Sequence, residues 1–299
     1  MNESEFLEKV EKADKQLSKK QVPIHARAFH AFHILAPDYV GPVIGYGVNS
    51  EDYPEFVGPN LLNRLSDWYE KIYGKRSYMP TDRGRIPVII RGEVYLIRIP
   101  LAFGQPRVSI LPLVEGLTKD MIRSLSQVEL KNIKDNFVAG YSLIYEIEDL
   151  RESLAPKGTI SLKNTILQTF QSAIEDRDTA SRCLSGQLDT NGACFHAQQH
   201  AEKMLKFFLL SKGVCTEAQI RKRPYAHNLI NILSKCVDCS SSFVSLSNDI
   251  SLLNNIPMDI RYTIAKVNPE VAEGAFWSSL RVGGLSACEV SGFDRRYKI

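Results

Sequence analysis

The two halves of the chain differ in the spacing of their apolar residues. In the first half, residues 4–20 place apolar positions at helical spacing among charged ones, and residues 58–75 carry one apolar stripe that ends near Gly74. Between these stretches, residues 41–48 form a short apolar run bounded by glycine and proline, which favours a strand. The pattern therefore predicts two helices and one strand in this part of the chain.

Residues 86–101 carry the clearest strand pattern. Two runs rich in β-branched residues flank Arg91-Gly92-Glu93, and the glycine can adopt a positive φ, so the pattern predicts a β-hairpin. Residues 107–114 are expected to add a third strand. Residues 117–152 follow as a long helical stretch, with a break expected near Gly140. The first half is thus predicted to be an α+β domain over residues 1–155.

Strand patterns stop at Pro156 and Gly158, which mark the expected junction. Short polar connections separate the helical stretches beyond it, which is typical of a bundle with antiparallel neighbours. The predicted helices cover residues 162–187, 192–211, 226–238, 243–255 and 268–290. The expected fold is therefore an α+β N-terminal domain followed by an all-α five-helix bundle, the latter folding independently over residues 160–299.

Composition adds little about partners but something about location. A chain of 299 residues is long enough for two domains, and a net charge of +3 favours no class of partner. The N-terminus is charged and lacks the apolar centre of a secretory signal, and no run is long enough to span a membrane. We expect a cytoplasmic protein whose six cysteines, all in the second half, are free thiols.

Three motifs of the second half occur in an order that resembles a known family. They read "ACFHAQQHAEKMLKFFLLSKG", "RPYAHNLINILSKC" and "IPMDIRYTI". Together they resemble the HEPN domain, a five-helix bundle, over about residues 160–290. The positions that carry the resemblance are Phe195, His196, Gln198, Gln199, Ala201, Glu202, Lys203, Lys206, His227, Leu229, Arg261 and Tyr262.

The resemblance implies a nucleotide- or nucleic-acid-binding or assembly module, in a bacterial defence or toxin–antitoxin setting. It also implies a homodimer formed through the bundle, with RNA or a nucleotide as ligand and no cofactor. We expect His196, His200 and Phe207 to form an exposed edge at this contact. The candidate binding residues are His196, His200, Lys203, Arg223, Arg261 and Tyr262.

An alternative function follows from the spacing of Arg221 and His227. Catalytic members of the HEPN family are metal-independent ribonucleases marked by arginine, four to six residues, then histidine, and here five residues intervene. Histidine can transfer the proton of a 2′-hydroxyl, and arginine can stabilise charge on the phosphate. Against this, Lys222 follows the arginine where the family favours a small polar residue or histidine, and Pro224 breaks the segment. The binding module therefore remains the preferred interpretation.

Two further groups could hold ligands. His196 and His200 are spaced to chelate one ion, and Cys236 and Cys239 form a C-x2-C pair, but the histidine pair lacks the glutamate expected at Ala197. We therefore predict no metal site.

Basic residues also recur across the predicted hairpin, with Tyr78 and Tyr95 between them. They are Lys75, Arg76, Arg83, Arg85, Arg91, Arg98 and Arg107. Such a surface could follow a phosphate backbone, but an ordinary solvated face is the preferred interpretation.

Overall fold

The computed structural model describes residues 2–20, 22, 24–39, 54–74, 82–101, 109–155, 160, 162–185, 188–222, 224–257, 259–262 and 266–292. Its contacts divide the chain into two compact units. One comprises Met1–Thr81 and Leu101–Val108, and the other comprises Asp82–Pro100 and Ser109–Ile299. The boundary expected at residues 155–160 therefore falls inside the second unit, because the hairpin and the long helix after it pack with the helices downstream.

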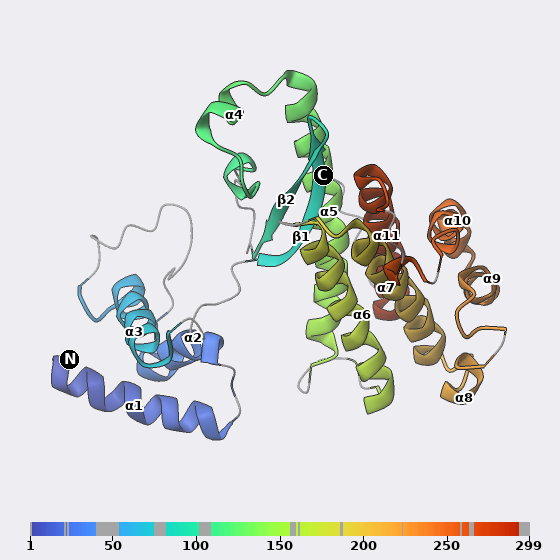
Figure 1. Cartoon of the computed structure of the whole chain (residues 1–299). Helices are drawn as coiled ribbons and strands as arrows, with labels where there is room; N and C mark the ends of the chain where they lie inside the picture. The colour runs from blue at the N-terminus through green and yellow to red at the C-terminus, as the bar shows by residue number, and fades with distance from the viewer. Residues whose placement is uncertain are drawn as a thin grey trace. The chain divides into compact units, whose positions relative to one another are not determined.

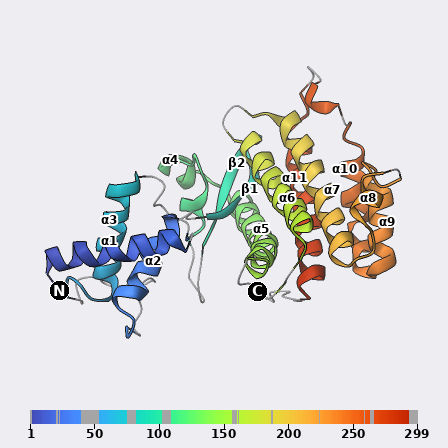
Figure 2. The ribbon, with the colours of Figure 1, turned by 90° about the horizontal axis from the view of Figure 1, so that it is seen from below.

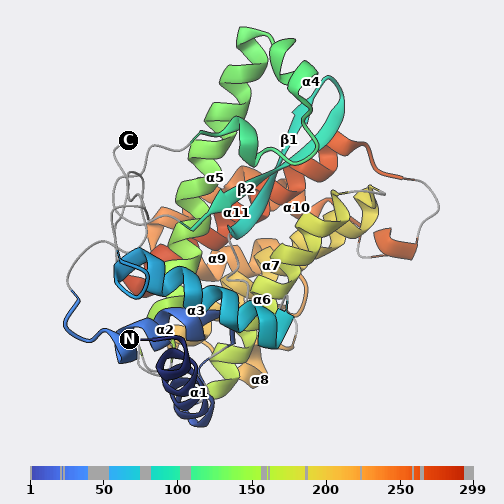
Figure 3. The same cartoon turned by 90° about the vertical axis from the view of Figure 1, so that its left-hand side faces the viewer.

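The first unit contains three packed helices, α1 (Glu3–Lys19), α2 (Ile24–Leu35) and α3 (Gly58–Tyr73) (Figure 3). The side chain of Asn2 caps α1 by accepting a hydrogen bond from the backbone N–H of Glu5. The predicted helices over 4–20 and 58–75 are confirmed, whereas the strand expected at 41–48 lies outside the described residues. The core of the unit consists of Phe6, Val10, Ala13, Leu17, Ala31, Phe32, Leu61, Leu62, Leu65 and Tyr69.

The predicted hairpin is confirmed as β1 (Asp82–Ile90) paired antiparallel with β2 (Glu93–Pro100). Arg91 and Gly92 form the turn with φ values of 53° and 83°, and two successive positive φ angles suit the right-handed twist of the flanking strands. The predicted third strand is wrong over the described residues 109–114. There the chain forms a 3-10 turn at Leu111–Leu113 and a single bridge from Val114 to Ile97. Pro112 has no N–H to donate to a ladder.

The break in the long helical stretch precedes Gly140. A short helix α4 (Lys119–Arg123) ends at Ser124, and α5 (Gln127–Ser153) then runs without interruption through Gly140. Ser126 starts α5, because its side chain and that of Glu129 each bond the other's backbone N–H.

Gly140 permits a close approach between elements. A Cβ atom built on it would lie 2.8 Å from Cγ2 of Ile86 in β1 and 3.2 Å from the ring of Trp277. The glycine therefore allows the hairpin and the last helix to come close to the backbone of α5.

The second unit is a helix bundle with the hairpin on its α5 side (Figures 1 and 2). Helix α7 packs against α6 and α11, α5 packs against α11 and β1, and α9 and α10 lie on the other side of α7. The all-α prediction for this region is confirmed, and each predicted helix is present. Their bounds are α6 (Asn164–Cys183), α7 (Thr190–Ser211), α9 (Leu229–Cys239), α10 (Ser247–Asn254) and α11 (Pro269–Ser291), with a short α8 (Glu217–Ile220) and 3-10 turns η4 (Ser241–Leu246) and η5 (Ile260–Tyr262).

Helix α7 is buried on more than one face. One face is formed by Ala197, Met204 and Phe208, which are at most 1% exposed. The expected exposed edge is wrong, however. Phe207 is fully buried and its ring packs against Phe170 of α6, with 4.9 Å between ring centroids. Helix α6 thus covers the side of α7 on which the sequence predicted an exposed edge. Within the described residues, no helix combines the length and apolarity needed to cross a membrane.

Candidate functional site

A polar hollow of about 330 Å³ lies between α6, α7 and α8. It brings together two of the residues singled out in the sequence, Lys203 and Arg221, although they come from different helices. Hydroxyl and amide side chains of α6 form one wall, and charged side chains of α7 and α8 form the others. The lining residues are Thr165, Gln168, Thr169, Ser172, Glu202, Lys203, Lys206, Leu210, Glu217, Ile220 and Arg221.

Glu202 connects the hollow to His227. Its carboxylate is only 5% exposed, and it accepts a 2.6 Å hydrogen bond from Nζ of Lys206, one turn later on α7. Its second oxygen lies 3.3 Å from Nδ1 of His227. Lys206 also donates to the carbonyl oxygen of Ala226 at 2.5 Å. These contacts attach the segment before α9 to α7 and fix where His227 lies.

One edge of the His227 ring contacts Glu202, and the other edge is exposed to solvent. Its side chain is 63% exposed, and the nitrogen that contacts Glu202 is Nδ1. The other ring nitrogen, Nε2, is therefore the one that an external group would meet. A carboxylate that contacts one nitrogen of an imidazole orients the ring and favours a proton on that nitrogen. In the sequence, Glu202 is identified only as a position of the family motif. Its contact with His227 could not be predicted, because the two residues are 25 positions apart.

Arg221 is the most exposed cation of the hollow. It follows α8, a single helical turn that starts at Thr216 with a reciprocal cap between Thr216 and Gln219. The guanidinium is 79% exposed and its ion pair with Glu217 is long, at 3.8 Å. The arginine is therefore only weakly engaged by its neighbour.

A second cluster adjoins the hollow at Lys203. Nζ of Lys203 donates to the hydroxyl of Ser172 at 2.9 Å and pairs with the carboxylate of Asp176. The other oxygen of Asp176 lies 2.8 Å from Nδ1 of His196, whose side chain is 29% exposed. His196 thus resembles His227 in having a partly buried carboxylate at Nδ1 and an outer edge open to solvent.

His200 lies in the core. It is completely buried and donates from Nδ1 to the carbonyl oxygen of Ala173 at 2.8 Å. Burial lowers the pKa of His200 to about 4, so the ring is neutral at pH 7. Its Nε2 lies against α11, where a Cβ built on Gly283 would be 2.6 Å away. In this conformation His200 packs three helices together and does not reach the surface.

Of the remaining candidates, Tyr262 is not among the residues that line the hollow. Tyr262 is 72% exposed and belongs to η5. Arg223 and the side chain of Arg261 lie outside the described residues. Within the described part of the chain, no group of three or more histidine, cysteine, aspartate or glutamate residues is placed to hold a metal ion.

Three arginines of the hairpin form ion pairs within the second unit. Arg83 pairs with Glu152 at 2.7 Å and stacks over the ring of Tyr145. Arg85 pairs with Glu115, and Arg91 pairs with Glu129, both at 2.9 Å. These contacts favour the interpretation that the hairpin is an ordinary face, since each of the three cations already has an acidic neighbour.

Comparison with known proteins adds one finding. Residues 167–279, from α6 into α11, match the family model described as HEPN domain. No curated protein and no solved structure matches the chain. The match covers the helices that build the hollow, and it confirms the family resemblance of the second half.

Proposed function

We propose that the HEPN domain of this chain, matched over residues 167–279, binds a nucleotide or a nucleic-acid strand at the hollow between α6, α7 and α8. The observation that supports this proposal is the exposed guanidinium of Arg221 beside that hollow. Arginine suits phosphate because its planar donors can bind two oxygens at once. The hydroxyl and amide groups of α6 add hydrogen bonds that a sugar or a base could use.

The cations of the hollow differ in how closely they pair with carboxylates. Lys203 is paired with Asp176, and Lys206 is paired with Glu202. Among the described residues, the acidic group paired with Arg221 is Glu217, at the long distance of 3.8 Å. We therefore expect Arg221 to contribute most to the binding of an anion and the two lysines to shape the site.

Titration of the full chain with single-stranded RNA and with adenosine monophosphate tests the proposal. Arg221→Gln should weaken binding about 10- to 100-fold, because a charge-assisted hydrogen bond contributes roughly 1.5–3 kcal/mol. Arg123→Gln is the matched control, since Arg123 is 78% exposed and also pairs with an acidic residue on its own helix. Equal weakening by both substitutions, or no binding of either ligand, would contradict the proposal.

A second function, metal-independent RNA cleavage, is favoured by the contact between Glu202 and His227. With Nδ1 oriented by the carboxylate, Nε2 of His227 could take the proton of a 2′-hydroxyl as that oxygen attacks the adjacent phosphorus. Arg221 would stabilise the added negative charge on the phosphate. The 5′-oxygen would leave with a proton from water or the imidazolium, giving a cyclic phosphate and a 5′-hydroxyl.

Cleavage of single-stranded RNA in EDTA decides between binding alone and binding with catalysis. If His227 is catalytic, His227→Ala should lower the rate about 10²–10⁴-fold, and Arg221→Ala should have a comparable effect. Glu202→Gln should lower the rate less, because it removes orientation and leaves the imidazole. Absence of cleavage by the wild type leaves the binding function, and cleavage that survives in both alanine variants rejects these roles.

A homodimer through the bundle also stays a proposal, and so do a cytoplasmic location and a setting in bacterial defence or a toxin–antitoxin system. Light scattering on the full chain at tens of micromolar measures the mass, and a monomer there would argue against a dimer whose association exceeds about 7 kcal/mol. A change at Phe207 is unsuitable for this test, because that residue is buried in the core.

A further inference from the structure

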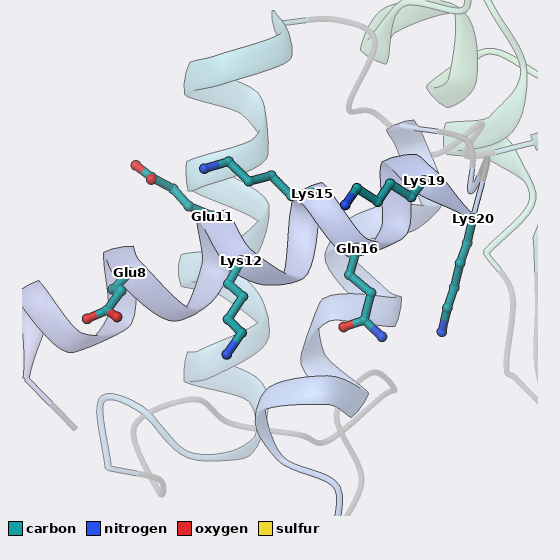
Figure 4. A pocket seen from close by; sticks show the side chains of 7 residues that line it. All are labelled: Glu8, Glu11, Lys12, Lys15, Gln16, Lys19 and Lys20. Atoms are coloured by element: carbon teal, nitrogen blue, oxygen red, sulfur yellow. The ribbon is translucent and has the colours of Figure 1, made fainter.

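The outer face of α1 carries a row of lysines around a shallow hollow of about 610 Å³ (Figure 4). Lys12, Lys15, Lys19 and Lys20 project from the second half of the helix, while the two acidic residues of the hollow lie toward its N-terminal end. The opposite face of α1 is buried in the core of the first unit. The lysine face is therefore fixed outward by the packing of the helix.

These lysines differ from most cations described above because they have no ion-pair partner among the described residues. Lys9, on the same helix, pairs with Glu5 at 2.8 Å. In contrast, Lys15 follows Lys12 by three positions and precedes Lys19 by four, which are spacings at which like charges repel on a helix. An anion bound between them would relieve this repulsion.

We propose that the lysine face of α1, formed by Lys12, Lys15, Lys19 and Lys20, binds the phosphate backbone of a single-stranded nucleic acid. At a rise of about 1.5 Å per residue, Lys12 and Lys19 lie roughly 10 Å apart along the helix. That span corresponds to about three steps of a stacked strand at about 3.4 Å each. A row of point charges on flexible stems suits successive phosphates without reading the bases.

A lipid surface fits this face less well. Helices that lie on membranes insert an apolar side, but the apolar side of α1 packs against α2 and α3. Glu8 and Glu11 border the same hollow and would face the anionic headgroups of a flat bilayer. A strand can follow the lysines and avoid the acidic end.

The test uses the full chain and the variant Lys12→Gln, Lys15→Gln, Lys19→Gln, because glutamine retains helix propensity. Affinity for a mixed-sequence single-stranded RNA is measured over a range of salt concentrations. Each phosphate contact contributes about 0.7 to the slope of log K against log salt for single strands, so the slope should fall by about 2 in magnitude. Binding of adenosine monophosphate, which is too short to span the row, should not change.

The control is Lys71→Gln, Lys119→Gln, Lys134→Gln, three exposed lysines on α3, α4 and α5 that give the same change in net charge. It should leave the slope within experimental error of the wild type. Equal effects of both variants, or an unchanged slope in the α1 variant, would overturn the proposal. Loss of binding to vesicles of phosphatidylcholine and phosphatidylserine, with RNA binding unchanged, would overturn it in favour of a membrane contact. Loss of RNA binding with monophosphate binding retained supports the lysine face and leaves the proposed HEPN site intact.

Discussion

Two histidines of α7, His196 and His200, and a third that contacts this helix, His227, have different surroundings. His200 is enclosed by α6, α7 and α11, whereas His196 and His227 keep one edge in solvent. Burial lowers the pKa of His200 to about 4 from an ordinary value of 6.5. As the pH falls, the unfolded chain therefore binds a proton at this position at a higher pH than the folded chain does. The neutral ring therefore favours folding above pH 6.5, and stability falls as the pH drops from 6.5 toward 4.

This histidine should make unfolding sensitive to acid. Between pH 7 and pH 5 we expect His200 to account for a loss of about 2 kcal/mol in the free energy of unfolding. Chemical denaturation at the two pH values measures the loss, and His200→Gln should reduce it. An equal loss in the wild type and in His200→Gln would show that other groups cause the acid sensitivity.

The sequence could identify these side chains as candidates but could not rank their exposure. The sequence predicted that His196 and His200 share one exposed edge, yet the side chain of His196 is 29% exposed and His200 is fully buried. The difference depends on which neighbouring helix covers each position, and that information is tertiary. Glu202 shows the same limit, since its contact with His227 joins residues on two elements.

At the level of elements, the close contacts of Gly140 give a prediction. Gly140→Ala would add a methyl group within 2.8 Å of Ile86, so we expect it to destabilise the protein by about 1–3 kcal/mol despite the better helix propensity of alanine. Gly274→Ala, in α11, is the matched control. The nearest atom to its new methyl is 3.8 Å away, and it should be neutral or stabilise by up to about 1 kcal/mol.

Denaturant midpoints of the two variants provide the measurement. If Gly140→Ala is as stable as Gly274→Ala, the hairpin does not approach α5 as closely as described. A lower midpoint for Gly140→Ala alone would show that this glycine is required by packing. Far-UV circular dichroism should remain helical in both variants, because neither change removes a backbone hydrogen bond.

Elements defined by local sequence were predicted well. The hairpin depends on Arg91 and Gly92 at adjacent positions, and the helix starts depend on caps within one turn. The third strand and the break at Gly140 were not predicted correctly. A glycine within a helix pattern can indicate a break or a close neighbour, and only the position of Ile86 distinguishes the two.

For the whole molecule, the second unit extends beyond the HEPN match to include α5 and the hairpin. Helix α5 covers α11 with Leu143 and the fully buried Ile147, which lie beside Gly284 and Gly283 of α11. A buried ion pair of 2.9 Å also joins Glu148 of α5 to Arg177 of α6. Removing α5 would expose the apolar face of α11 and leave Arg177 without this partner.

We therefore predict that the fragment 82–299 unfolds cooperatively at a higher temperature than the fragment 158–299. Circular dichroism melts of both fragments measure the difference. The fragment 158–299 should also bind a hydrophobic dye, because the surface of α11 facing α5 becomes accessible. Equal melting temperatures and no dye binding would instead support the boundary expected at residues 155–160. An apolar stripe in the sequence does not identify the helix that covers it, so the boundary expected at residues 155–160 depends on this comparison.

The meeting of Ile86, Gly140 and Trp277 also has a consequence for synthesis of the chain on the ribosome. Ile86 and Trp277 are about 190 positions apart, yet both approach the same glycine. At roughly 5–20 residues per second, the hairpin leaves the ribosome about 10–40 s before the helix that completes its packing. During this interval the apolar surface of α5 and the hairpin that α11 covers faces solvent, so we expect nascent chains that stop before α11 to be held by chaperones and cut readily by proteases.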